Sequence, residues 1–73
     1  MTWDEELERM VAKTWAVGES FTLDDIYRFE RHFAGLYPKN DHVRDKLRQV
    51  LQHLREKHVV AFVDSHGGYR RKR

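Results

Sequence analysis

The chain has 73 residues, of which 36% are charged and 40% hydrophobic, with one proline and no cysteine. A chain of this length is expected to fold as one domain spanning residues 1–73, with a core too small to enclose a large substrate cavity. The absence of cysteine excludes a disulfide scaffold and a thiolate metal site, and it fits a reducing compartment. No apolar run approaches the roughly 20 residues of a membrane span, so we expect no membrane association.

The charges are unevenly distributed along the chain. Residues 1–37 carry eight acidic and four basic side chains, a net charge of −4, whereas residues 38–73 carry four acidic and ten basic ones, a net charge of +6. A basic half beside an acidic half favours a surface that meets a polyanion. An unevenly charged but merely solvated surface explains the same numbers.

A first helix is predicted over about residues 3–16. Thr2 and Glu5 have the spacing of a capping box, and the apolar residues that follow repeat at helical spacing. Gly18 is expected to end this helix. Residues 20–22 leave room for a turn or a brief strand.

A second helix is predicted over about residues 23–37. Thr22 and Asp25 form another capping box at its start, and one apolar stripe runs through the segment. Pro38 is expected to end it, because the residue before a proline avoids helical geometry.

The third predicted helix, over about residues 41–58, has the most regular pattern in the chain. Its apolar side chains lie within about a third of its circumference, and Asn40 or Asp41 is expected to cap it. A β-branched run and a glycine-containing loop then predict a hairpin over about residues 59–71.

This order of elements, a helix, a short strand, two helices and a hairpin, is that of a winged helix-turn-helix. The predicted fold class is therefore mainly α with a small β-hairpin. Most small domains with a basic third helix in this arrangement bind nucleic acid, although some are protein-interaction modules.

The polar side of the third helix combines arginine, glutamine and carboxylate. Glutamine can pair with adenine, arginine with guanine, and a carboxylate can accept from an exocyclic amine in the major groove. The alternative is that Asp45 only pairs with Arg48 or Gln49 on a solvated helix face. The hairpin and basic C-terminal end are expected to contact phosphates, unless they serve only as a solubilising terminus. The predicted DNA-contact residues are Lys39, Asn40, Asp41, His42, Arg44, Asp45, Arg48, Gln49, Gln52, Tyr69, Arg70 and Arg71.

Catalysis and metal binding have little support. The five histidines form no pair at i,i+4 spacing and no cysteine accompanies them. No serine or cysteine nucleophile stands in a known motif. The carboxylates of residues 4–8 occupy the first turns of a helix, where negative charge is favourable. We therefore expect no enzyme activity and no metal, cofactor or small-molecule substrate.

Two segments carry a family resemblance, FTLDDIYRFE at residues 21–30 and LYPKNDHVRDKLRQVLQHLREK at residues 36–57. They resemble the C-terminal winged-helix domain of the Dam-replacing and DpnI-type restriction endonucleases. That pattern runs approximately FTLxEVYxFE, then a proline-asparagine turn, then VKxKIRQxLQxLRDxGxIEF. The resemblance spans about residues 20–71, with His58 standing where a glycine commonly closes the helix.

The resemblance implies a reader of double-stranded DNA that contains N6-methyladenine, typically in GATC, with full methylation preferred over hemimethylation. The family's nuclease domain is absent from this sequence, so the resemblance implies no nuclease activity of its own. The chain is then a stand-alone reader or the target-recognition part of a methyl-dependent restriction endonuclease. The alternative function is a methylation-indifferent winged-helix transcriptional regulator. We expect a monomer in the cytoplasm, associated with the nucleoid, of prokaryotic or viral origin.

The candidates for contact with the methyl groups are His42, Asp45 and Trp15. Trp3 shares the apolar stripe of the first helix and is expected in the core. Four further aromatic residues are expected in the core or at its edge: Tyr27, Phe29, Phe33 and Phe62.

Overall fold

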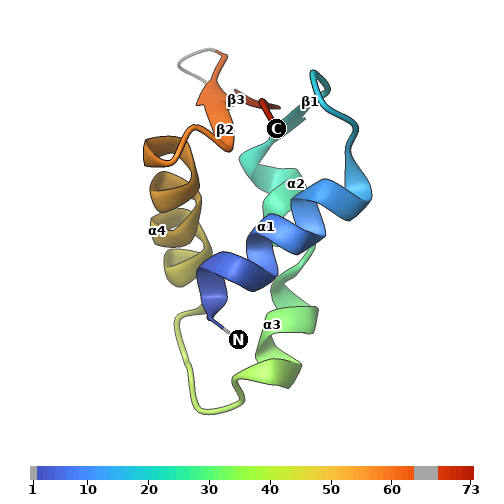
Figure 1. Ribbon diagram of the computed structural model, residues 1–73. Helices are drawn as coiled ribbons and strands as arrows, with labels where there is room; N and C mark the ends of the chain where they lie inside the picture. The colour runs from blue at the N-terminus through green and yellow to red at the C-terminus, as the bar shows by residue number, and fades with distance from the viewer. Residues whose placement is uncertain (1, 64–67) are drawn as a thin grey trace.

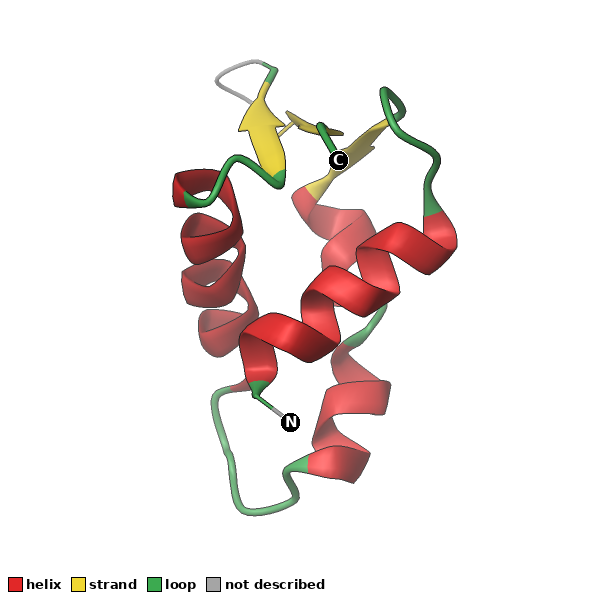
Figure 2. Cartoon of the chain, viewed as in Figure 1, coloured by secondary structure: helices red, strands yellow, loops and turns green. Residues whose placement is uncertain are grey.

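The computed structural model describes residues 2–63 and 68–73, and in these ranges it has four helices and one antiparallel three-stranded sheet (Figures 1 and 2). The elements are α1 (Trp3–Thr14), β1 (Ser20–Thr22), α2 (Leu23–Tyr27), α3 (Glu30–Leu36), α4 (Val43–Glu56), β2 (Val60–Phe62) and β3 (Gly68–Arg71). Strand β3 lies between β1 and β2. The predicted fold class, mainly α with a wing, is confirmed.

Capping boxes start α1 and α2, as the sequence predicted. The amide of Glu5 donates to Thr2 Oγ1 and the amide of Thr2 donates to Glu5 Oε1, both at 3.1 Å. Thr22 and Asp25 repeat the arrangement at the start of α2. Each box satisfies helix amides that would otherwise lack acceptors.

Helix α1 ends at Thr14, earlier than the predicted end near residue 16. Trp15 is already extended, with φ −125° and ψ 143°, because its ring turns to stack on Phe21 at a centroid distance of 4.2 Å. Gly18 lies beyond the helix end, at φ +92°, and its amide donates to the carbonyl of Arg71. The glycine therefore shapes the turn into β1 and does not end α1.

The single helix predicted over residues 23–37 is wrong, because the structure divides it into α2 and α3. At the break, the amides of Arg28 and Phe29 donate to the carbonyls three residues earlier, at 3.3 and 3.0 Å. Such bonds tighten the chain into a 3₁₀-like turn. Neither glycine nor proline marks this turn, so apolar spacing alone predicted a continuous helix.

The break serves the packing against α1. Phe29 packs on Trp15 and Phe33 stacks on Trp3, with centroid distances of 5.8 and 4.9 Å. The two tryptophans are twelve residues apart on the chain, about 18 Å of helix rise, whereas one turn, about 6 Å, separates the two phenylalanines. Dividing the segment lets α2 follow β1 while α3 lies under the start of α1 (Figure 1).

Helix α4 spans Val43–Glu56, within the predicted range of about 41–58. The predicted caps at its start are wrong, since the N-cap is His42 and no side chain caps the helix. Asn40 instead accepts from the amide of His42 at 2.8 Å and stabilises the preceding turn.

The C-terminal end of α4 is closed by a Schellman motif. His58 adopts φ +63°, its amide donates to the carbonyl of Arg55 at 3.1 Å, and the amide of Val59 donates to that of Leu54 at 2.9 Å. A glycine adopts this left-handed conformation at lower cost, which agrees with the glycine of the family pattern. Here the hydrogen bonds of the motif hold a histidine in it.

The core gathers around the apolar stripe of α4. Its buried members are Val43, Leu47, Val50, Leu51 and Leu54, and they pack with Leu7, Val11, Phe21, Ile26, Phe33, Val59 and Val60. Trp3 packs against this cluster between Phe33 and Tyr37, so its predicted place in the core is confirmed. Phe62 was predicted wrongly, because its side chain is 53% exposed.

A buried carboxylate ties α1 to α3. Glu6 is only 2% exposed, and its two oxygens accept from Arg9 Nε at 2.9 Å and Arg9 Nη2 at 2.8 Å. His32 Nε2 lies 2.5 Å from Glu6 Oε2. Hydrogen bonds from Arg9, and then from His32, lower the pKa of Glu6 from 4.5 to about 2. A carboxylate in the core is tolerated because both oxygens have cationic or donating partners.

None of the helices in residues 2–63 and 68–73 is long and apolar enough to cross a lipid bilayer.

Replacing Glu6 with glutamine should lower the melting temperature at neutral pH by roughly 5–10 °C, because Arg9 and His32 lose their ionised acceptor. The folded-state pKa of Glu6, about 2, is below its ordinary 4.5, so this contribution is present above pH 4.5 and is lost as the pH falls toward 2. The difference between wild type and Glu6→Gln should therefore shrink over that range in thermal unfolding followed by circular dichroism. Glu8→Gln, an exposed change in the same helix, is the control. A constant difference from pH 6 to pH 2.5 would contradict the assignment.

Candidate nucleic-acid interface

Helix α4 forms one side of the molecule, with α1 on its inner side and the sheet beyond its C-terminal end (Figure 1). Because residues of a helix are about 100° apart, its polar side chains fall into three rows. The row opposite the apolar stripe contains Asp45, Gln49, Gln52 and, in the last turn, Glu56, and we call the first three of these residues the reading row. The row on one flank, the arginine edge, contains Arg44, Arg48 and Arg55. The row on the other flank contains Lys46, His53 and Lys57.

The reading row is open to solvent. Asp45, Gln49 and Gln52 are exposed, and within the described ranges their side chains make no hydrogen bond or ion pair. The pairing of Asp45 with Arg48 or Gln49 that would make this face a self-satisfied surface is not observed. The row therefore offers amide donors and acceptors and one carboxylate to an external partner.

The first and last residues of the arginine edge, Arg44 and Arg55, contact side chains of other elements. Arg44 Nε lies 3.1 Å from Glu30 Oε1 of α3, and its guanidinium lies 5.0 Å from the ring centroid of Tyr27. The guanidinium of Arg55 lies over the ring of Phe62. Arg48, between them, is exposed, and it makes no ion pair with any residue that the structure describes.

The row on the other flank is drawn toward α1. His53 Nδ1 and Lys57 Nζ lie 3.2 and 3.6 Å from Asp4 Oδ2. The sequence placed Asp4 only among carboxylates that favour a helix start, and its tie to α4 was missed because the partners are about 50 residues away. The contacts of Asp4 with His53 and Lys57 fix the orientation of α4 and leave the reading row on the outer side.

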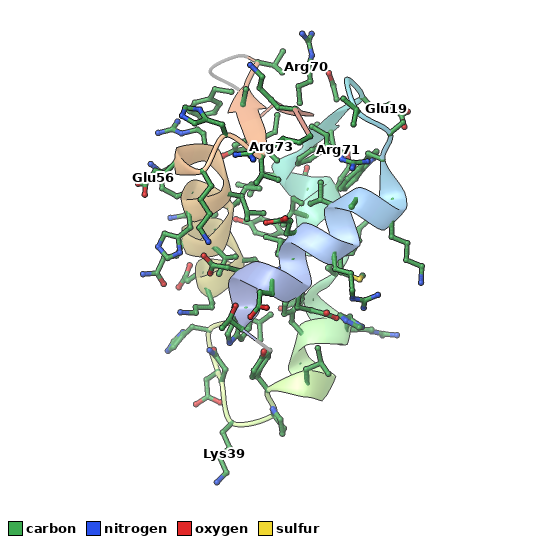
Figure 3. All side chains as sticks on the ribbon, viewed as in Figure 1. Glu19, Lys39, Glu56, Arg70, Arg71 and Arg73 are labelled. Atoms are coloured by element: carbon green, nitrogen blue, oxygen red, sulfur yellow. The ribbon has the colours of Figure 1, made fainter. Side chains whose placement is uncertain are left out.

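The turn before α4 carries the other predicted contacts. Asp41 and His42 are exposed, and their side chains have no intramolecular partner among residues 2–63 and 68–73. Lys39 projects from the end of the molecule opposite the wing (Figure 3). A shallow cavity of about 500 Å³ adjoins this turn and is lined by Trp3, Leu36, Tyr37, Pro38, Lys39 and Asn40.

Trp15 is not brought together with the other two methyl-contact candidates. Its ring packs on Phe21 and Phe29, at the C-terminal end of α1. His42 and Asp45 lie at the start of α4. Trp15 therefore serves the core, and of the three candidates only His42 and Asp45 share the outer side of α4.

In the wing, Tyr69 and Arg70 differ in exposure. Tyr69 is half-buried, and its ring stacks on Phe21 of β1 and Phe62 of β2. Arg70 is exposed and projects away from the sheet (Figure 3). Lys72, part of the basic C-terminal end that was expected to contact phosphates, is exposed as well.

Two arginines of the basic C-terminal end cap helices. Arg71 Nη1 donates to the carbonyls of Trp15 at 2.6 Å and Ala12 at 3.4 Å, at the end of α1. Arg73 Nη2 donates to the carbonyl of Lys57, at the end of α4. A cation at a helix C-terminus satisfies free carbonyls and the partial negative charge there. Arg71 was predicted to contact DNA, but its side chain is already occupied within the fold.

Within the described part of the chain, no group of three or more His, Cys, Asp or Glu side chains could hold a metal ion.

Arg71→Ala should lower the free energy of unfolding by about 1–2 kcal/mol, because the α1 carbonyls lose a charged donor. Arg70→Ala, one residue earlier on the same strand, should stay within about 0.5 kcal/mol of wild type. Urea unfolding followed by tryptophan fluorescence measures both. Equal losses for the two variants would mean that Arg71 contributes no more than an ordinary exposed strand residue.

The outer side of α4, the turn that precedes it and the wing thus each expose polar or basic side chains on a winged helix. Comparison with known protein families gives a match to the Dam-replacing HTH domain over residues 6–71, nearly the whole chain. That family indicates a DNA-binding domain. The chain belongs to the family of Dam-replacing HTH domains.

Proposed function

We propose that this domain reads N6-methyladenine in double-stranded DNA, favouring fully methylated GATC over hemimethylated sites. It would bind as a monomer with α4 in the major groove and would have no nuclease activity of its own. The observation that carries the proposal is the reading row, an exposed set of polar side chains that have no partner among the described residues, on a helix of a DNA-binding fold.

The chemistry of the reading row suits base edges better than phosphates. Gln49 and Gln52 each offer an amide donor, which can pair with N7 of adenine even when N6 is methylated, and Asp45 can accept from the exocyclic amine of cytosine. A surface made only for phosphates needs cations and no carboxylate. Phosphate contacts are assigned instead to Lys39, Arg48 and, in the wing, Arg70.

Arg44 differs from Arg48 because it already pairs with a carboxylate within the fold. Glu30 neutralises its guanidinium before any DNA arrives. To contact a base or phosphate, Arg44 would exchange that carboxylate for the new acceptor, which reduces the net gain. No carboxylate in the described part of the chain pairs with Arg48, so we assign it the larger contribution to affinity.

Methyl reading by a single helix is physically reasonable. In the palindromic 5′-AT-3′ step of GATC, the two adenine N6 groups lie on adjacent base pairs and face the major groove. One helix can therefore contact both methyl groups. We assign these contacts to the first turn of α4, where His42 and Asp45 are exposed.

Methylation of both strands should raise the affinity for a GATC duplex on the order of tenfold, with the hemimethylated duplex in between. Burial of each methyl group contributes about 0.8 kcal/mol, roughly fourfold in affinity. Fluorescence-anisotropy titrations of the three duplexes at one salt concentration measure this order. Equal affinity for all three would favour a methylation-indifferent transcriptional regulator. No binding to any duplex at low salt would favour a protein-interaction module.

Gln49→Ala should cost about 1–3 kcal/mol on the preferred site and relax the preference at one base pair, with little change in salt dependence. Arg48→Ala, its neighbour on α4, should weaken all duplexes alike and reduce the salt slope by about one. Titrations against duplexes with single base-pair changes, at several salt concentrations, separate the two effects. A uniform loss for Gln49→Ala would remove it from the base-reading set.

A further inference from the structure

The wing exposes two large apolar side chains within a basic surface. Phe62 is 53% exposed and Val63 is 45% exposed. Arg70 and Lys72 lie beside them, and together with Ala61 these four residues line a shallow cavity of about 220 Å³. An apolar patch with a cationic rim differs from an ordinary solvated hairpin, which would present polar side chains here.

The ring of Phe62 contacts two neighbouring side chains, Tyr69 and Arg55. Its ring stacks on Tyr69 at a centroid distance of 5.1 Å and an angle of 14°, and the guanidinium of Arg55 lies 4.8 Å from its centroid. The stack continues from Tyr69 to Phe21 at 5.9 Å and from Phe21 to Trp15 at 4.2 Å. Four rings therefore connect the interior to the wing and fix the exposed part of Phe62 in place.

The position of Phe62 relative to α4 indicates what its exposed side meets. The arginine edge separates the reading row from the wing, and Arg55 of that edge touches Phe62 directly. With the reading row in the major groove, a phosphate strand passes over the arginine edge. The groove on the far side of that strand is the minor groove.

We propose that Phe62 and Val63 enter the minor groove beside the site read by α4, an inference that rests on the proposed function. A phenyl ring offers nothing to a phosphate, but phenylalanine is one of the apolar side chains that minor-groove-binding proteins insert into that groove. Arg70 and Lys72 lie against the phosphates that border that groove. The N2 amino group of guanine obstructs the floor of this groove, so the wing favours A·T pairs in the flank.

The test uses the full chain and methylated GATC duplexes whose flanking pairs are A·T, G·C or inosine·C. Inosine keeps the major-groove edge of guanine but lacks its N2 amino group. Wild type should bind the A·T and inosine·C flanks alike, about fivefold to tenfold more tightly than the G·C flank. Phe62→Ala should lose this difference. Leu36→Ala, which changes another exposed apolar side chain, 49% exposed, at the far end of α3, should keep it.

Phe62→Leu keeps an apolar contact and should retain the flank preference, and melting temperatures establish that each variant is folded. Equal affinity for all flanks in wild type, inosine·C behaving as G·C, or a preference that persists in folded Phe62→Ala would each overturn the inference. In those cases methylated GATC is still bound, so the proposed function stands. A wild-type chain that binds none of the duplexes overturns both.

Discussion

Burial of one stripe of α4 is the constraint on which the rest of the structure depends. Leu47, Val50, Leu51 and Leu54 are fully buried, and they contact elements from both halves of the chain. A small domain has few such residues to bury, so the stripe cannot be turned outward without losing the core. Because the stripe must face the core, the opposite side of the helix must face outward, and the reading row lies on that side. The ties of Asp4 to His53 and Lys57 then restrain rotation of the helix about its axis.

Much of this architecture follows from local patterns in the sequence. The capping boxes at Thr2 and Thr22, the apolar stripe of α4 and the β-branched run of β2 each depend on neighbours within a few residues. Such signals can be recognised in the sequence without knowledge of the tertiary structure. The reading row could also be predicted, because a regular helix with one buried stripe leaves its opposite side determined by periodicity. What local pattern missed was the break at residues 28–29, where packing of Phe29 and Phe33 against separate parts of α1 overrides the helical spacing.

The partners of individual charges could not be predicted in the same way. Glu6 and Glu8 are equivalent in sequence, two carboxylates near a helix start, yet Glu6 is buried between Arg9 and His32. Arg70 and Arg71 are adjacent arginines, but alternation along β3 sends Arg70 outward and Arg71 toward the end of α1 (Figure 3). These differences arise from which element lies opposite a side chain. Which element lies opposite a side chain depends on the tertiary structure. A resemblance to a family predicts it only where the same residues are present.

The same distinction limits what the charge of the C-terminal half means for DNA binding. Residues 38–73 contain ten basic side chains, but only part of them are available to phosphates. Glu30 neutralises Arg44, Asp4 holds Lys57, and Arg71 and Arg73 compensate the C-terminal ends of α1 and α4. Arg55 keeps its charge but is oriented by Phe62.

The cations without an intramolecular partner in the described ranges are Lys39, Lys46, Arg48, Arg70 and Lys72. They lie in the turn before α4, on α4 and in the wing. Counterion release depends on such free cations and not on total charge, so the electrostatic part of binding is about half of what composition indicates. Under the proposed function, base and methyl contacts would supply the rest of the affinity.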